Sequence, residues 1–82
     1  MKKTIKRVDV VVYKNSTGKQ HTSDVIGACL GYEPTQAYMC AMLVHNNGNY
    51  VVKKFKKKEL EIARNTVSLM IEKGLDARLL FA

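Results

Sequence analysis

The segment YKNSTGKQHT, residues 13–22, carries residue types that bind phosphate in many proteins. Gly18 and Lys19 are adjacent, as they are in the glycine-rich loops that hold nucleotide phosphates. Such a loop also needs a glycine five residues before Gly18 and a serine or threonine after the lysine, but this chain has Tyr13 and Gln20 there. The small polar residues of the segment therefore favour an ordinary turn over a nucleotide site.

Residue types that hold metals or perform catalysis form no recognisable pattern. Cys29 and Cys40 are eleven residues apart without a C-x-x-C pair, which indicates two buried thiols in preference to a disulfide. A zinc site would have to add His21 and His45, whose spacings fit no compact ligand pattern. The acidic residues are scattered, and no serine or cysteine has an evident base partner. We expect a protein that is not an enzyme and that uses no metal or cofactor.

The basic residues are concentrated in two places. Fourteen Lys and Arg residues against seven Asp and Glu residues leave a net charge of +7. Such clusters attract nucleic acid or other acidic surfaces, and Tyr50 or Phe55 would be available to stack on a base. The alternative is a solvated strand edge with Phe55 turned into the core, because lysines also keep an edge strand from pairing with other chains. The clusters consist of Lys2, Lys3, Lys6 and Arg7, and of Lys53, Lys54, Lys56, Lys57 and Lys58.

Three segments have the composition and alternation of strands. In residues 5–13, alternate valines from Val8 to Val12 share one face, so this strand should cover the core with that face. The other two strands are expected at residues 49–55 and at residues 78–82.

Three further segments have helical character. The first helix is expected to be capped by Thr22 or Ser23 and to carry Asp24 in its first turn. The second, residues 34–45, is apolar nearly all round, which is typical of a helix that is central to its domain or that lines a binding groove. The third is expected at residues 57–73.

The order β-α-α-β-α-β predicts an α+β two-layer sandwich, with a small three-stranded sheet packed against three helices. A chain of 82 residues is too short for two cores, so we expect a short basic segment at residues 1–7 and a single domain at residues 8–82. No apolar run approaches the length of a membrane span, and the lysine-rich start is not followed by the apolar stretch of a signal peptide. These features predict a cytoplasmic protein with no membrane partner.

Several of these features together resemble the ClpS family of adaptors. The run AYMCAMLVHNNG, residues 37–48, is the most specific match, and the element order, the second strand and the third helix agree with it. ClpS proteins bring substrates to AAA+ proteases, and the C-terminal domain of the ribosomal stalk protein shares their fold. The resemblance covers residues 8–81. It implies a ClpS-like fold and two kinds of partner, namely the N-domain of a AAA+ unfoldase and a protein or peptide ligand.

In ClpS proteins, a groove beside the second helix captures the free N-terminus of a substrate. An acidic run after the first strand, a threonine and the histidine that ends the second helix hold the α-ammonium, and a ring of Met, Val and Leu residues takes the first side chain. The resemblance places Thr17, Val44 and His45 at matching positions. By itself, His45 would indicate only a basic side chain that favours the negative end of a helix dipole.

The remaining groove positions depart from the family pattern. Lys14 and Asn15 stand where the family has carboxylates, and Lys19 stands where the family has an apolar residue at the edge of the groove. Thr22 replaces a valine, and Ala41 replaces a methionine. The resemblance therefore implies a peptide-binding groove made of Lys14, Asn15, Thr17, Lys19, Thr22, Ala41, Val44 and His45.

No acidic residue lies between Asp9 and Asp24, so an α-ammonium lacks its usual counter-ion in any alignment of this loop. A nearby lysine would repel the ammonium by about 1 kcal/mol or more. We therefore expect a ClpS-like adaptor or regulator of a AAA+ Clp protease with altered or lost N-degron specificity. One alternative is a small basic domain that binds nucleic acid or the ribosome through Lys53–Lys58. Another is a decoy that blocks a host adaptor, which the short segment before the first strand suggests.

Overall fold

The computed structural model describes residues 5–82, and it confirms the predicted order of elements. Lys2 and Lys3 of the first basic cluster lie outside the described residues. The elements are β1 (Arg7–Tyr13), α1 (Lys19–Leu30), α2 (Pro34–Asn47), β2 (Asn49–Lys56), the 3-10 turn η1 (Lys57–Glu59), α3 (Leu60–Glu72) and β3 (Asp76–Phe81).

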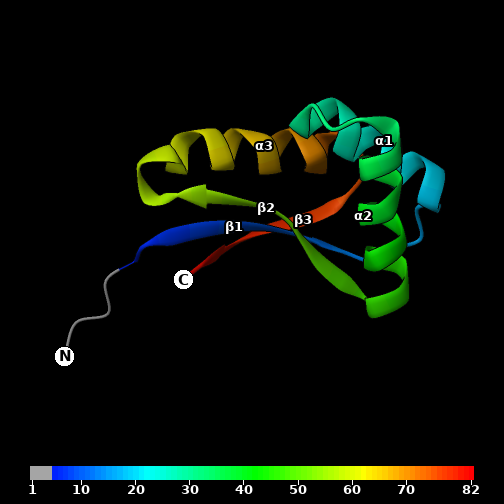
Figure 1. The fold of residues 1–82 in the computed structure, drawn as a ribbon, viewed down its shortest axis with the longest axis horizontal. Coiled ribbons are helices and arrows are strands. Elements are labelled where there is room, and N and C mark those ends of the chain that lie inside the picture. The colour runs from blue at the N-terminus through cyan, green and yellow to red at the C-terminus, as the bar shows by residue number, and fades with distance from the viewer. Residues whose placement is uncertain (1–4) are drawn as a thin grey trace.

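The three strands form one antiparallel sheet in the order β2-β1-β3. Figure 1 shows α3 lying along one face of this sheet and α2 standing across the end where β2 begins. Within the described residues, no helix covers the opposite face (Figure 1). The predicted α+β sandwich of a three-stranded sheet and three helices is therefore confirmed.

The central strand β1 is buried on both of its faces. Its three alternate valines are buried on the helix side, as predicted. Asp9 and Val11 alternate with them and are buried as well, because β2 and β3 flank them on either side. Asp9 accepts a hydrogen bond of 2.8 Å from Nε of Arg7, so this buried carboxylate is paired with a cation.

An irregularity in the β1–β2 pairing ties the linker between α1 and α2 to the sheet. Val10 pairs with Lys53 and Val11 pairs with Val51, so Val52 is the extra residue of a β-bulge. The Tyr32 hydroxyl donates a hydrogen bond of 2.6 Å to the carbonyl oxygen of Val52. Burial raises the pKa of the Tyr32 phenol, which keeps this donor protonated at neutral pH.

The first helix begins earlier than its sequence suggested. Gly18, in an extended conformation, is the N-cap of α1, so the prediction that Thr22 or Ser23 caps the helix is wrong. The Thr22 hydroxyl instead donates to the carbonyl oxygen of Gly18 at 3.1 Å, inside the helix. Asp24 consequently lies beyond the first turn, where it accepts a hydrogen bond of 2.9 Å from Gln20.

The other helix ends follow the predicted residue types with shifted boundaries. Pro34 stands in the first turn of α2, which continues to Asn47 because only Gly48 adopts the left-handed conformation that ends it. The predicted start of the third helix at Lys57 is wrong, since η1 separates β2 from α3. The Lys56 amide donates to a Glu59 carboxylate oxygen at 3.0 Å, and this bond closes the tighter turn.

Side chains from all three helices meet those of the sheet in one core. Ile26 of α1, Val44 of α2 and Met70 of α3 are buried in the same cluster as the β1 valines. Because each helix contributes to that cluster, the positions of the helix ends and of the loops between them depend on its packing.

Replacing Ile26, which is 0% exposed, by Ala should lower the free energy of unfolding by about 2–5 kcal/mol, because the change leaves a cavity. Ile62 is 55% exposed, so Ile62→Ala is a matched control that should cost about 0.5 kcal/mol or less. Urea unfolding followed by circular dichroism measures both values. Equal losses in the two variants would contradict this packing.

Candidate functional site

The loop between β1 and α1 is held to the turn between α3 and β3. The Asn15 side-chain oxygen accepts a hydrogen bond of 2.9 Å from the Thr17 amide, which forms a local Asx turn. The Asn15 amide nitrogen and the Thr17 hydroxyl both donate to the carbonyl oxygen of Gly74, at 3.0 and 3.3 Å. Two side chains expected to line a ligand groove therefore already bind the protein itself.

The same loop touches the end of α2. The Lys14 amide donates a hydrogen bond of 2.8 Å to the carbonyl oxygen of Gly48, and Gly48 in turn donates to the carbonyl of Val44. His45 lies in the last turn of α2 and is half-buried. The structure thus brings the start of the loop close to the histidine-bearing end of α2, as the resemblance implied.

The apolar part of the expected groove belongs to the interior. Thr22, Ala41 and Val44 are all buried, so a ligand would have to displace other side chains to reach them. Lys14 and Lys19 are exposed at the surface of the loop. Of the eight expected residues, two are therefore exposed (Lys14 and Lys19), three are half-buried (Asn15, Thr17 and His45) and three are buried (Thr22, Ala41 and Val44).

A carboxylate that the sequence pattern did not indicate lies beside this loop. The register of β1 with β3 pairs Tyr13 with Asp76. Nε of Arg78 lies 3.4 Å from the Asp76 carboxylate, and the Arg78 guanidinium lies 4.8 Å from the centroid of the Tyr13 ring. Asp76 is therefore already partnered by a cation. Only the strand register reveals this neighbour.

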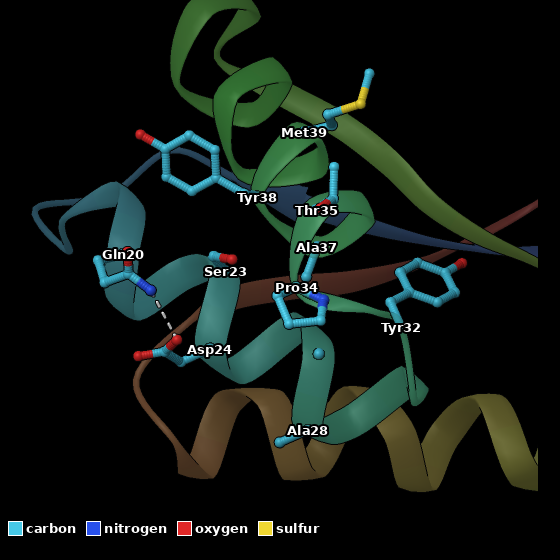
Figure 2. A pocket seen from close by; sticks show the side chains of 11 residues that line it. Gln20, Ser23, Asp24, Ala28, Tyr32, Pro34, Thr35, Ala37, Tyr38 and Met39 are labelled. Carbon is cyan, nitrogen blue, oxygen red and sulfur yellow. Dashed lines mark hydrogen bonds between the residues drawn. The ribbon is translucent and has the colours of Figure 1, made fainter.

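A hollow of about 610 Å³ opens between α1 and the first turns of α2, and we call it the α1–α2 hollow (Figure 2). None of the eight expected groove residues lines it. Apolar side chains form most of its wall, and Asp24 brings one carboxylate to it. The lining residues are Gln20, Ser23, Asp24, Gly27, Ala28, Tyr32, Pro34, Thr35, Ala37, Tyr38 and Met39.

The α1–α2 hollow was not predicted because the residues that line it form no recognisable motif in the sequence. The apolar character of α2 was expected of a helix that is central to its domain or that lines a groove. One side of α2 is buried in the core, and Tyr38 and Met39 line the α1–α2 hollow. A smaller hollow of about 400 Å³ lies on the other side of Asp24, lined also by His21, Val25, Ala28 and Lys73.

Both cysteines are free thiols packed in or against the core. Burial raises the pKa of the Cys40 thiol. Burial also raises the pKa of the Cys29 thiol, an effect that the charge of Lys73 partly offsets. Both are therefore protonated and weakly nucleophilic at neutral pH. In the described part of the chain, no three His, Cys, Asp or Glu residues lie together as metal ligands would.

The strand register brings Arg7, from the described part of the first basic cluster, beside the second basic cluster. Arg7 pairs with Lys56 across β1 and β2, so the start of β1 and the end of β2 form one basic end of the molecule. Phe55 is buried, which agrees with a solvated strand edge that turns this ring into the core and leaves it unable to stack on a base. Tyr50 is half-buried against the core. All five lysines of the second cluster are exposed, namely Lys53, Lys54, Lys56, Lys57 and Lys58.

Comparison with known proteins gives a match at the level of structure. No family model matches the chain, and no curated protein matches it. The solved structure of Agrobacterium tumefaciens ClpS2 bound to L-phenylalaninamide matches 96% of this chain and 100% of its own, with a TM-score of 0.85 and 16% sequence identity. The chain has a ClpS-like fold. This confirms the fold implied by the sequence run at the end of α2, and it extends the likeness to the whole length of ClpS2.

The ClpS-like chain also contains no helix, among residues 5–82, with the length and apolar character needed to cross a membrane.

In this ClpS-like fold, Asn15→Ala should lower the free energy of unfolding by about 1–3 kcal/mol, because it removes both the Asx turn and the bond to Gly74. Ser16 is exposed, so Ser16→Ala is a neighbouring control with little expected effect. Amide hydrogen exchange at Thr17 should accelerate only in the Asn15 variant. Unchanged exchange at that amide would show that the loop is held in another way.

Proposed function

We propose that this protein is a non-enzymatic protein-binding adaptor or regulator of a AAA+ Clp protease, with altered or lost specificity for N-terminal residues. The observation that carries the proposal is the match to ClpS2 over nearly the entire chain. The match covers 96% of this chain and all of the ClpS2 chain, which supports a similar mode of action by analogy of fold. The likeness concerns the fold, so the binding specificity is argued from the residues of the loop.

Those residues do not suit the ligand of the matched structure. L-phenylalaninamide carries a free α-ammonium and an aromatic side chain. The described loop places Lys14 beside the end of α2 and the exposed Lys19 at the start of α1, and residues 14–19 supply no acidic residue. Two like charges about 4 Å apart repel by about 1 kcal/mol in water and by about 4 kcal/mol near a protein surface. The lysines therefore disfavour a ligand that carries an ammonium, whereas a ligand with a neutral or acidic chain end is tolerated.

The polar groups of the groove are also committed to other partners. Asn15 and Thr17 bind Gly74, and a ligand that used them would have to replace those bonds. His45 is the remaining half-buried polar side chain of the expected groove. We infer that the protein uses its ClpS-like fold mainly to occupy an unfoldase, either as an adaptor for other ligands or as a decoy that displaces a host adaptor.

A second candidate function rests on the basic end of the molecule. The pairing of Arg7 with Lys56 joins clusters that are far apart in sequence, and the lysines there are exposed. Seven basic side chains in one region can neutralise several phosphates of a nucleic acid. Because Phe55 is buried, such binding would be electrostatic and would lack stacking on that ring.

The adaptor proposal predicts saturable binding to the isolated N-domain of a Clp unfoldase and no binding of L-phenylalaninamide tighter than about 1 mM. Binding to the unfoldase domain follows from the fold, and weak binding of L-phenylalaninamide follows from the missing carboxylate. Calorimetry measures the binding of the unfoldase domain, and NMR titration measures the binding of L-phenylalaninamide. A degradation assay with a genuine adaptor present then separates delivery from inhibition.

Matched variants test the charge argument. Lys14→Asp places a carboxylate in the loop and should strengthen binding of L-phenylalaninamide, whereas Lys58→Asp makes the same charge change at the basic end and should not. Micromolar binding of L-phenylalaninamide by the unaltered protein would refute the change in specificity. No binding of the unfoldase domain would refute the adaptor role.

The nucleic-acid alternative predicts that binding to mixed RNA and DNA weakens steeply with salt, by about 0.7–0.9 logarithmic units per phosphate neutralised. Replacing the five lysines of Lys53–Lys58 by Ser should flatten this dependence. Lys14→Ser with Lys19→Ser, at the other end of the molecule, is the control. Fluorescence anisotropy over a salt series measures the slopes, and a flat response of the unaltered protein would eliminate this function.

A further inference from the structure

We infer that the α1–α2 hollow binds an arginine side chain carried by a segment of a partner protein, with Asp24 as the counter-ion of its guanidinium. This rests on the proposed protein-binding role. It concerns a different surface, because the hollow shares no residue with the groove expected from the ClpS resemblance.

The polar atoms at the α1 side of the hollow are hydrogen-bond acceptors. One oxygen of Asp24 accepts a bond of 2.9 Å from the amide nitrogen of Gln20, which leaves the other carboxylate oxygen and the Gln20 carbonyl free to accept (Figure 2). No basic side chain of the described residues forms an ion pair with Asp24, since the two pairs present involve Asp9 and Asp76. A carboxylate with only a neutral partner favours a cationic donor.

Ser23 adds an acceptor deeper in the hollow. The residue is only 5% exposed, and no described hydrogen bond uses its hydroxyl. No side-chain oxygen in the described part of the chain is both fully enclosed and unpaired, so the Ser23 hydroxyl reaches the open space of the hollow. Figure 2 shows it between Gln20 and the start of α2. A ligand with several N–H groups would contact Ser23 and Asp24 together.

The remaining walls suit the flat, partly apolar guanidinium group and its aliphatic stem. Tyr38 is 40% exposed and Met39 is 59% exposed, and both line the hollow together with Pro34 and Ala28 (Figure 2). A guanidinium stacks on an aromatic ring while it donates to a carboxylate in its plane, which a lysine ammonium does less well. Apolar side chains exposed beside a hollow are typical of a protein-binding surface.

A metal ion is a poor alternative occupant. Hard divalent cations need several oxygen ligands, usually including more than one carboxylate, and Asp24 is the one carboxylate that lines the hollow.

The net charge of +7 does not prevent such binding. The basic end lies at the far end of a molecule that is 42 Å long, and charges are screened over about 8 Å at physiological ionic strength (Figure 1). A positive group nearer to Asp24 is Lys73, which lines the smaller hollow together with Asp24 and His21. His21 is held there by a contact of 2.8 Å between its Nε2 and the carbonyl oxygen of Lys73.

The test uses a short peptide of Ala and Leu with one central Arg, acetylated and amidated so that its ends carry no charge. A matched peptide replaces Arg by citrulline, which has nearly the same shape without the charge. NMR titration should show at least about tenfold tighter binding of the arginine peptide, with the largest shifts at Ser23, Asp24 and Tyr38. Asp24→Asn, which keeps an acceptor for Gln20, should abolish the preference.

Glu61→Gln is the matched control variant, because it removes one exposed carboxylate from α3 and should leave the preference unchanged. Equal affinity for the two peptides, or an undiminished preference in Asp24→Asn, would overturn the inference. So would shifts confined to Lys14–Thr17. If Asp24→Asn does not fold, the comparison of arginine with citrulline in the unaltered protein decides by itself.

Failure of this inference is distinguishable from failure of the adaptor role. Binding of the unfoldase domain without any preference for arginine refutes the inference alone. An arginine preference without binding of the unfoldase domain refutes the adaptor role and leaves a peptide-binding protein. Both readouts use the full chain.

Discussion

The structure depends on the pairing of β1 with strands on both sides. The sheet has only three strands, so the loss of either partner would leave a two-stranded ribbon, which is marginally stable in water. The β1 valines lie in the same buried core cluster as side chains from all three helices. Asp9 can be buried in the same strand because Arg7 stays within hydrogen-bonding distance, which removes the penalty of an isolated charge.

The two ends of β1 have different chemistry because the pairing registers gather different side chains there. At its start, Arg7 lies opposite Lys56, so the described basic residues of β1 and β2 share one end of the sheet. At its end, Tyr13 lies opposite Asp76, and the following loop rests on the α3–β3 turn. Surfaces proposed for different partners are thus held apart by the length of the central strand. Screening lets each act with little influence from the other.

The contacts that hold the β1–α1 loop are separate from the charges on its surface. Asn15 and Thr17 stabilise the loop through Gly74, so the loop does not rely on a bound ligand for its conformation. The lysines that flank them face solvent, where their charge costs little in the absence of a ligand. The proposed change of specificity therefore requires no change in the hydrogen bonds that hold the loop.

Local sequence determined the elements of this protein because their signals are short-range. Alternate valines indicated β1, Pro34 the start of α2, and Gly31 and Gly48 the ends of α1 and α2. The helix run that ends at His45 also indicated the ClpS-like fold. The tertiary structure alone decided how the loop before α1 is held, because Asn15 bonds to Gly74, fifty-nine residues away. It also decided that Tyr13 lies opposite Asp76 and that Asp24 lies at the α1–α2 hollow. These depend on strand register and helix packing, which join residues far apart in the chain, and no local pattern specifies such contacts.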